Sequence, residues 1–348
     1  MISINWNEIN KVYIIHHDDM DGKFAAYVTK QYCEVEKNIN DIEYIEANYT
    51  FNPLEPFYHK DLSNSLIFIV DYSTSVEAMV CLFRNVTVKE RNIVWIDHHI
   101  SAIDKFSRLY PKIHNIPGLR CSDEFCGAEL AYLYLYENVK NVSRDPFTPS
   151  YIKDSREVTR KNLTDLIQES SMSTLSIVGD YDTFRSNVLT NAHAFHLYFR
   201  TYCPEFKNSN ECTEFFNIVL NKDNLDDIIR DGKIMKDYVD ANNKFILDTI
   251  GCKSILRKFE DIEIIAVNTN MKNSTVFDSV KDDYEVGIVY HYNAKIGRML
   301  YSLYRLNKNP DRFISCAKIA ESFGGGGHER SAGFSTSGIL ELKPKIVY

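Results

Sequence analysis

Short apolar runs rich in β-branched residues recur along the first half of the chain, each followed by acidic residues or histidines. The runs at 12–15, 66–70 and 93–96 have the length and composition of buried strands, and a fourth strand is expected at 42–47. Helical spacing of apolar residues follows these runs, at 23–33, 76–84 and 126–136. Strands that alternate with helices predict an α/β domain with a largely parallel sheet.

The second half of the chain has a different pattern. A long helix is expected over 223–248, and the following elements are a strand at 262–267, a hairpin formed by 284–292 and 298–306, and a helix at 315–323. These elements predict a smaller, mixed α/β domain. The expected organisation is therefore a first domain over 1–222, a linker helix over 223–248 and a second domain over 249–348.

Potential metal ligands follow each apolar run. In an extended segment alternate side chains point the same way, so His17, Asp19 and Asp21 are expected to project together. The other two runs lead to Asp71 and to the triplet 97–99, and the carboxyl ends of strands in an open α/β sheet face one crevice. Taken alone, an acidic turn after a strand is more often a solvated loop than a metal site, but the recurrence of such turns favours a metal site.

A further apolar run, at 175–179, leads to two more carboxylates, Asp180 and Asp182. Its periodicity does not distinguish a strand from a helix. Two histidines further on, His193 and His196, lie on an expected helix among aromatic residues and are interpreted as packing residues.

Composition narrows the class of protein. The chain has 348 residues, 44% of them hydrophobic, a length that suggests two domains with sizeable cores. It lacks a leader-like start and an apolar run of membrane-spanning length, so a soluble cytoplasmic protein without a membrane partner is expected. The eight cysteines form no CxxC pair and are expected to be reduced. A net charge of −8 argues against a protein that coats long nucleic acid.

Five motifs in order resemble those of one known family. HDDMDG at 17–22, the Asp71 of VDYS, the Asp97, His98, His99 triplet and GDYD at Asp180 resemble the four motifs of the DHH phosphoesterases. GGGGHERSAGF at 324–334 resembles the glycine-rich signature of the DHH-associated C-terminal domain of the first type. Family II inorganic pyrophosphatases share the first four motifs but carry a different C-terminal domain.

This resemblance implies a two-metal site in the first domain. One divalent ion would be held by His17, Asp19 and Asp71. The other would be held by Asp21, Asp71, His98 and Asp180, with Asp71 as the bridge and Asp182 as the competing choice for the last carboxylate. Mixed imidazole and carboxylate ligands favour manganese, with magnesium as the alternative. Asp97 would orient a neighbouring group, and His99 would bind phosphate or donate a proton to the leaving oxygen.

The resemblance also implies that the second domain binds substrate, with the active site in the cleft between the domains. The implied substrate-binding residues are Arg305, Gly325, Gly326, Gly327, His328 and Arg330. The stretch 295–330 holds seven basic residues against three acidic ones, which favours a phosphate-bearing ligand. Two details depart from the usual family pattern: Arg305 lies one residue late, and Ser331 stands where alanine is common.

The expected function is a metal-dependent phosphodiesterase of exonuclease type that releases mononucleotides from short RNA or DNA, as the nanoRNases (oligoribonucleases) of this family do. Hydrolysis of a cyclic dinucleotide or of its linear product is the alternative. A non-catalytic, nucleotide-binding scaffold is the alternative of another class, although every expected ligand type is present. The expected partners are short oligonucleotides or dinucleotides rather than long duplexes. RNA or DNA preference, cleavage polarity, homodimer formation and biological pathway are left open.

Overall fold

The computed structural model describes residues 4–48, 51–85, 87–88, 92–110, 116–120, 125–139, 160–183, 189–207, 209–256, 259, 261–270, 274–327 and 329–339. The chain folds into two compact units, residues 1–235 and 236–348, and the division falls inside helix α9 (Leu225–Ile250). Helix α9 matches the helix expected over 223–248. Within the described ranges, no helix is both long and apolar enough to cross a membrane.

A four-stranded parallel sheet forms the centre of the first unit. Its strands lie in the order β2-β1-β3-β4, and every pairing between neighbours is parallel. This confirms the α/β fold class expected from the sequence. The strands are β1 (Lys11–His17), β2 (Ile42–Ala47), β3 (Ser65–Val70) and β4 (Ile93–Ile96).

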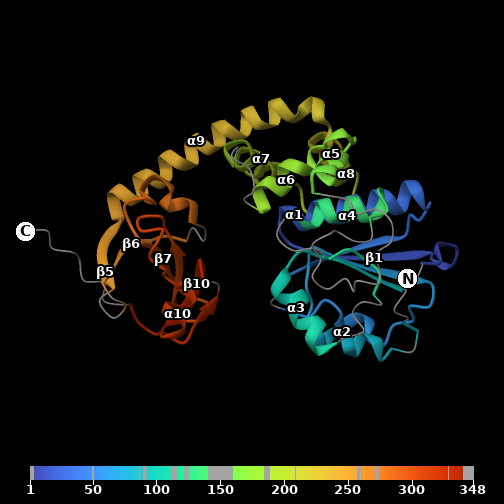
Figure 1. Cartoon of the computed structure of the whole chain (residues 1–348), viewed down its shortest axis with the longest axis horizontal. Helices are drawn as coiled ribbons and strands as arrows, with labels where there is room; N and C mark the ends of the chain where they lie inside the picture. Colours follow the sequence, from blue (N-terminus) through green and yellow to red (C-terminus); the bar gives the residue numbers. More distant parts are fainter. Residues whose placement is uncertain are drawn as a thin grey trace, which may run out of the picture. The chain divides into compact units, whose positions relative to one another are not determined.

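Helices cover both faces of this sheet (Figure 1). Alternation along β1 sends Val12 and Ile14 into the core under α1 and α4, whereas Tyr13 and Ile15 enter the core under α2 and α3. Strands buried on both faces account for the uninterrupted apolar runs in the sequence. The covering helices are α1 (Met20–Gln31), α2 (Val76–Phe83), α3 (Ile100–Leu109) and α4 (Gly127–Leu135).

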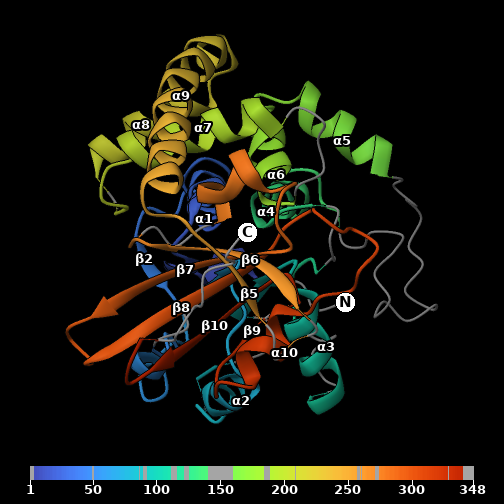
Figure 2. The same ribbon diagram turned by 90° about the vertical axis from the view of Figure 1, so that its left-hand side faces the viewer.

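A second helical layer packs on α1 and α4, on the side away from the sheet (Figures 1 and 2). The run at 175–179, whose sequence pattern was ambiguous, is helical and belongs to α6. Most of the polar stretch at 141–161 lies outside the described residues. The helices of this layer are α5 (Arg160–Glu169), α6 (Leu175–Asp182), α7 (Leu189–Tyr202) and α8 (Asn210–Leu220).

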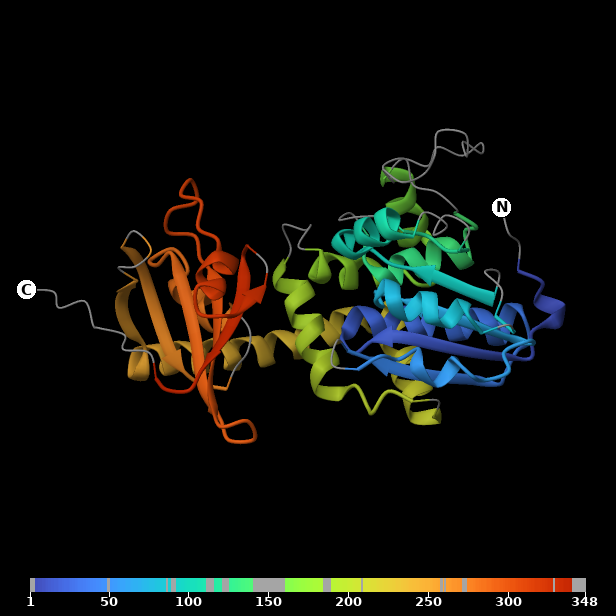
Figure 3. The ribbon, with the colours of Figure 1, turned by 90° about the horizontal axis from the view of Figure 1, so that it is seen from below.

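The second unit contains a six-stranded mixed sheet in the order β5-β6-β7-β8-β10-β9. Strands β7 and β8 form the expected hairpin, seen as neighbouring orange strands in Figure 3, and β6 pairs with β7 in parallel. This confirms the smaller mixed domain. Its elements are β5 (Cys252–Leu256), β6 (Ile262–Asn268), β7 (Val286–Asn293), β8 (Arg298–Arg305), α10 (Cys316–Glu321), β9 (Gly326–Gly327) and β10 (Ser331–Thr336).

Short turns of other helix types connect several of these elements. Turns of 3-10 helix occupy Trp6–Glu8, Glu55–Phe57, Lys222–Asn224 and Ser274–Val280, and α1 continues into a π-helical turn at Tyr32–Glu36.

Candidate metal centre

The register of the parallel sheet aligns the ends of three strands. His16 pairs with Val70 of β3, and Val70 pairs with Ile96 of β4. The next residue on each strand is therefore at the same level, which places His17, Asp71 and Asp97 in one row at the carboxyl edge of the sheet. The sequence predicted this convergence from the strand ends alone.

The turn after β1 is built differently from the expected extended segment. The strand ends at His17, and Asp19 is the N-cap of α1: its Oδ1 accepts a hydrogen bond from the amide of Gly22 at 2.9 Å. Its Oδ2 lies 2.7 Å from Nδ1 of His17. The turn is tight, since a Cβ on Gly22 would lie 2.3 Å from the carbonyl oxygen of His17. His17 and Asp19 therefore meet because of a helix cap, and not because of strand alternation.

Asp21 lies in the first turn of α1 and is only 2% exposed. Its carboxylate accepts hydrogen bonds from the amides of Gly127, at 2.6 Å, and Ala128, at 2.8 Å. These amides open α4, so the partial positive charge of a helix N-terminus faces the carboxylate. A Cβ on Gly127 would lie 2.4 Å from Cβ of Asp71, so glycine is required where α4 approaches the row of strand ends.

Asp97 is fully buried and is surrounded by donors. Its Oδ1 lies 2.7 Å from Nδ1 of His99 and accepts the His98 amide at 2.8 Å, while Oδ2 accepts the hydroxyl of Ser73 and the indole N–H of Trp95. Burial by itself raises the pKa of Asp97, but the hydrogen bond and the charge of His99 outweigh it and lower the pKa to about 2. Asp97 is thus an ionised carboxylate that fixes the orientation of the His99 ring.

The imidazole of His98 lies among three carboxylates. Its Nε2 is 3.1 Å from Oδ1 of Asp71, 3.5 Å from Oδ2 of Asp182 and 3.7 Å from Oδ2 of Asp21. Asp180, the carboxylate favoured from the sequence, belongs to none of the groups of described residues whose ligand atoms lie within metal-binding reach of one another. The segment is the helix α6, where positions two apart point in different directions. The structure therefore favours Asp182 over Asp180 as the carboxylate of this segment.

Three groups of side chains have ligand atoms within 4.8 Å of one another, and shared residues join them into one cluster. Asp71 belongs to two groups and His98 to two. We call this set the acidic cluster. The groups are Asp71, His98 and His99; His17, Asp19 and Asp71; and Asp21, His98 and Asp182.

The electrostatics of the acidic cluster fit divalent cations. Burial and the charges of Asp21 and Asp19 raise the pKa of Asp71 well above its ordinary range and raise that of Asp182 to about 8. Oδ1 of Asp71 and Oδ2 of Asp182 are buried and accept no hydrogen bond from the described residues, although Nε2 of His98 lies close to both. Buried carboxylate oxygens without donors are costly unless a cation binds them. Oxygen and imidazole ligands of this kind suit manganese, zinc or iron, and also magnesium.

The expected substrate-binding residues lie in the second unit. Arg305 ends β8, where its guanidinium donates a hydrogen bond to the carbonyl of Pro310 at 3.2 Å and its carbon Cζ lies 5.8 Å from the ring centroid of Phe313. Arg330 is exposed, and its carbonyl accepts the amide of Arg305 at 2.9 Å. His328 lies outside the described residues.

Part of the glycine run belongs to the sheet of the second unit. Gly326 and Gly327 form β9 and pair with β10. A Cβ on Gly325 would lie 2.1 Å from the carbonyl oxygen of Gly333, so the backbone packs closely here.

Sequence reasoning missed the groups that support the cluster. The hydroxyl of Ser73 and the indole of Trp95 hold Asp97, and the first amides of α4 hold Asp21. Ser73 stands two residues after Asp71, a position that could have been noticed. The amides of α4 leave no signal in residue type, apart from the glycine at 127.

Residues 11–167 match the sequence model of the DHH family, N-terminal domain. The match lies within the first unit and covers somewhat less than half of the chain. None of the curated proteins matches the chain.

Several solved structures resemble the chain in fold. The DHH domain of a protein assigned to a family of ribosomal proteins has a TM-score of 0.53 at 14% identity, over 94% of this chain and 83% of that one. RecJ of Thermus thermophilus, in complex with Mn²⁺, has a TM-score of 0.49 at 14% identity, over 95% of this chain and 50% of RecJ. The pGpG-specific phosphodiesterase PggH of Vibrio cholerae has a TM-score of 0.47 at 10% identity, over 93% of both chains. At such identities the first likeness supports a shared fold and no more.

Proposed function

We propose that this protein is a metal-dependent phosphodiesterase that releases mononucleotides from short oligonucleotides. The observation that carries the proposal is the acidic cluster, in which buried oxygens of Asp71 and Asp182 accept no hydrogen bond from the described residues. The cluster lies at the carboxyl edge of a parallel sheet, where α/β proteins place their sites. The match of residues 11–167 to the DHH family, N-terminal domain, supports the same class of chemistry.

The cofactor we propose is a pair of divalent cations, with manganese favoured over magnesium. His17, Asp19 and Asp71 would hold one ion, and Asp21, Asp71, His98 and Asp182 would hold the other. When bound, such a pair lowers the pKa of water and stabilises the attacking and leaving oxygens of an in-line displacement at phosphorus.

The chain's own residues would position and protonate the substrate. The Asp97 carboxylate holds Nδ1 of His99, so Nε2 is the ring nitrogen that can meet the substrate. Burial lowers the pKa of His99, but the hydrogen bond and charge of Asp97 outweigh it and raise the pKa to about 9. An imidazolium in this position is suited to bind a phosphoryl oxygen and to give the Nε2 proton to the leaving oxygen as the P–O bond breaks.

The charge of the chain supports short substrates. At a net charge of −8, the whole molecule repels a long polyanion, whereas the basic excess at 295–330 offers local charge for a few phosphates. A cyclic dinucleotide, or its linear product, carries similar phosphates and is the alternative substrate.

The test is manganese-dependent hydrolysis of a matched set: dinucleotides, five-residue RNA and DNA, a long single strand and cyclic di-AMP. Wild type should cleave the short linear substrates fastest. An Asp71→Asn variant should be inactive on all of them, since both proposed ions use that carboxylate. Fastest cleavage of cyclic di-AMP would favour the alternative, and binding without cleavage of any substrate would favour the nucleotide-binding scaffold.

A further inference from the structure

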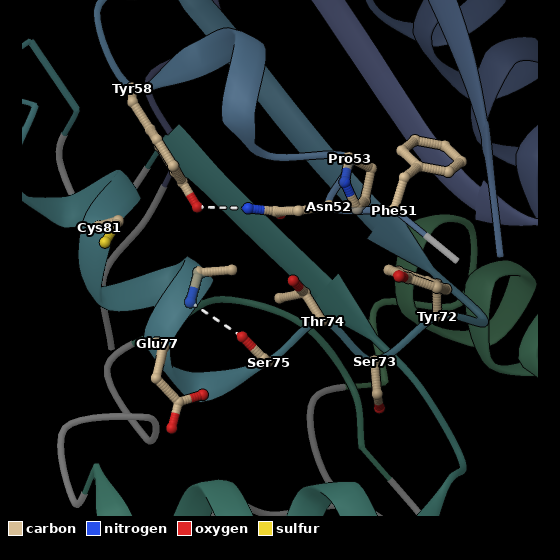
Figure 4. A pocket seen from close by; sticks show the side chains of 11 residues that line it. Phe51, Asn52, Pro53, Tyr58, Tyr72, Ser73, Thr74, Ser75, Glu77 and Cys81 are labelled. Carbon is tan, nitrogen blue, oxygen red and sulfur yellow. Dashed lines mark hydrogen bonds between the residues drawn. The ribbon is translucent and has the colours of Figure 1, made fainter. Parts of the chain in front are cut away.

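A pocket of about 480 Å³ opens between the loop that follows β2 and the start of α2 (Figure 4). In this view the rings of Phe51 and Tyr72 lie at one end of the pocket, Tyr58 and Cys81 lie at the other, and Thr74 lies between them. The volume is within the range of small-molecule sites in proteins. All of these residues belong to the first unit.

The pocket offers aromatic surface together with uncommitted polar groups. Phe51 is 50% exposed, although large aromatic side chains are usually mostly buried. The Thr74 hydroxyl makes no hydrogen bond within the described part of the chain, although Thr74 is only 7% exposed. The hydroxyl of Tyr58 accepts a hydrogen bond from the side-chain nitrogen Nδ2 of Asn52 at 2.7 Å. Its own hydrogen is therefore available to a ligand.

The charge of the lining selects the kind of ligand. Among the lining residues that the structure describes there is no lysine or arginine, and Glu77 is the one with a charged side chain. Among these described side chains a phosphate would meet no cation and would face the carboxylate of Glu77. A flat, uncharged ring with exocyclic donors fits better, because aromatic side chains stack on it and hydroxyl or carboxylate oxygens accept from its amino groups.

The pocket also shares residues with the proposed catalytic machinery. Tyr72 and Ser73 directly follow Asp71, and the Ser73 hydroxyl donates to the Asp97 carboxylate that holds His99. A ring in the pocket would therefore belong to a nucleotide next to the phosphate at the acidic cluster.

We propose that this pocket binds a nucleobase of the substrate, that of the nucleotide flanking the scissile phosphate. The proposal rests on the proposed function and adds to it a specificity site in the first unit, with Phe51 as the stacking residue. It makes part of the affinity for substrate depend on a base rather than on phosphates.

The kinetic test compares the linear dinucleotide pApA with two analogues that lack the base at one position or the other. In wild type, one of the two analogues should show a KM raised about tenfold, the loss expected for one stacked base. Phe51→Ala should raise KM for pApA by a similar factor, leave KM for that analogue unchanged, and leave kcat unchanged. Equal increases of KM for pApA and that analogue would overturn the proposal.

Two control variants sharpen the comparison. Phe51→Tyr keeps a ring in the same place and should retain the KM of wild type. Val35→Ala removes another exposed apolar side chain of the first unit, 70% exposed and outside the pocket, and should change nothing. A Val35→Ala variant that matched Phe51→Ala would contradict a specific role for Phe51.

A binding test separates this proposal from the proposed function, because it needs no turnover. The fluorescence of 2-aminopurine riboside, an uncharged nucleoside, should be quenched saturably by wild type and not by Phe51→Ala. If no diester is hydrolysed but the riboside shows this difference, the proposed function fails and the base pocket stands. If diesters are hydrolysed but neither KM nor quenching depends on Phe51, the base pocket fails and the proposed function stands.

Discussion

Asp71 is the residue on which the acidic cluster depends. Its backbone adopts a left-handed conformation, with φ of 49°, which aspartate and asparagine tolerate better than most residues. Asp71 is 1% exposed, and the charges of Asp21, Asp19, Asp182 and Asp97 add to burial in raising its pKa. Without a bound cation this carboxylate opposes folding, as functional groups often do.

Replacement of Asp71 by asparagine should therefore stabilise the metal-free protein. Asparagine keeps the shape and the left-handed backbone, removes a buried charge and gains donors for the neighbouring carboxylates. We expect the free energy of unfolding in EDTA to rise by roughly 1–3 kcal/mol, the cost range of an unsatisfied buried polar group. Urea unfolding in EDTA and in Mn²⁺ measures this.

Wild type should gain stability when Mn²⁺ replaces EDTA, because an ion that binds the native state stabilises it. Asp71→Asn should gain little, because it lacks the carboxylate that both proposed ions use. Asp41→Asn, which changes an aspartate that is 61% exposed in the same unit, should behave as wild type. A fall in the stability of Asp71→Asn in EDTA would show that Asp71 has a structural role that outweighs its charge.

Individual site residues differed in how well the sequence predicted them. Acidic residues directly after buried strands were predictable, because strand ends in a parallel sheet converge whatever the loops do. The family resemblance favoured Asp180, because the family places its aspartate directly after the apolar run, and the structure offers Asp182 in its place. The run is helical, and a helix turns Asp182 toward His98.

Among the elements, α4 shows how a helix terminus supports the site. Its first amides bind the Asp21 carboxylate, and its glycine at position 127 allows contact with Asp71. The sequence predicted this helix and its start, but which carboxylate the helix start would meet depended on tertiary packing. The turn after β1 is a similar case, since Asp19 acts as a helix cap where alternation along a strand was expected.

Glu285, the residue directly before β7 in the second unit, is a buried carboxylate that is 2% exposed. It accepts hydrogen bonds from Arg312 at 2.8 Å, from Asn309 at 2.7 Å and from the amide of Glu263 at 2.8 Å. Burial alone would raise its pKa, but these donors outweigh burial and lower the pKa below its ordinary value of 4.5. The ionised Glu285 carboxylate therefore stabilises the folded second unit at pH values above 4.5.

Glu285→Gln should destabilise the second unit at neutral pH by roughly 1.5–3 kcal/mol, because charged hydrogen bonds are lost. The difference from wild type should shrink as pH falls from about 5 towards the lowered pKa, where Glu285 itself becomes protonated. Since both tryptophans, Trp6 and Trp95, lie in the first unit, amide hydrogen exchange of peptides covering β7 and β8 is the suitable measurement.

The matched control for this prediction is Glu263→Gln. The side chain of Glu263 is 32% exposed and pairs with Lys308 at 2.7 Å, so its replacement should cost less than about 1 kcal/mol. A pH-independent effect of Glu285→Gln would contradict the linkage.

For the whole molecule, the sequence predicted two α/β parts and a long helix that connects them along the chain, which is α9. It could not predict the strand order of the second sheet. There β8 pairs with β10, which follows α10 and the glycine run, and such distant pairings are specified by packing rather than by local pattern. The pairing of Gly326 and Gly327 with β10 is likewise a tertiary effect that the local pattern does not specify.

The count of Mn²⁺ ions bound per chain, measured by equilibrium dialysis with elemental analysis, tests the central claim most directly. We predict two ions for wild type, two for Asp180→Asn, and one or none for Asp182→Asn. The reason is that Asp182 belongs to the acidic cluster, whereas Asp180 does not. Two ions in Asp182→Asn, or fewer than two in wild type, would contradict the account.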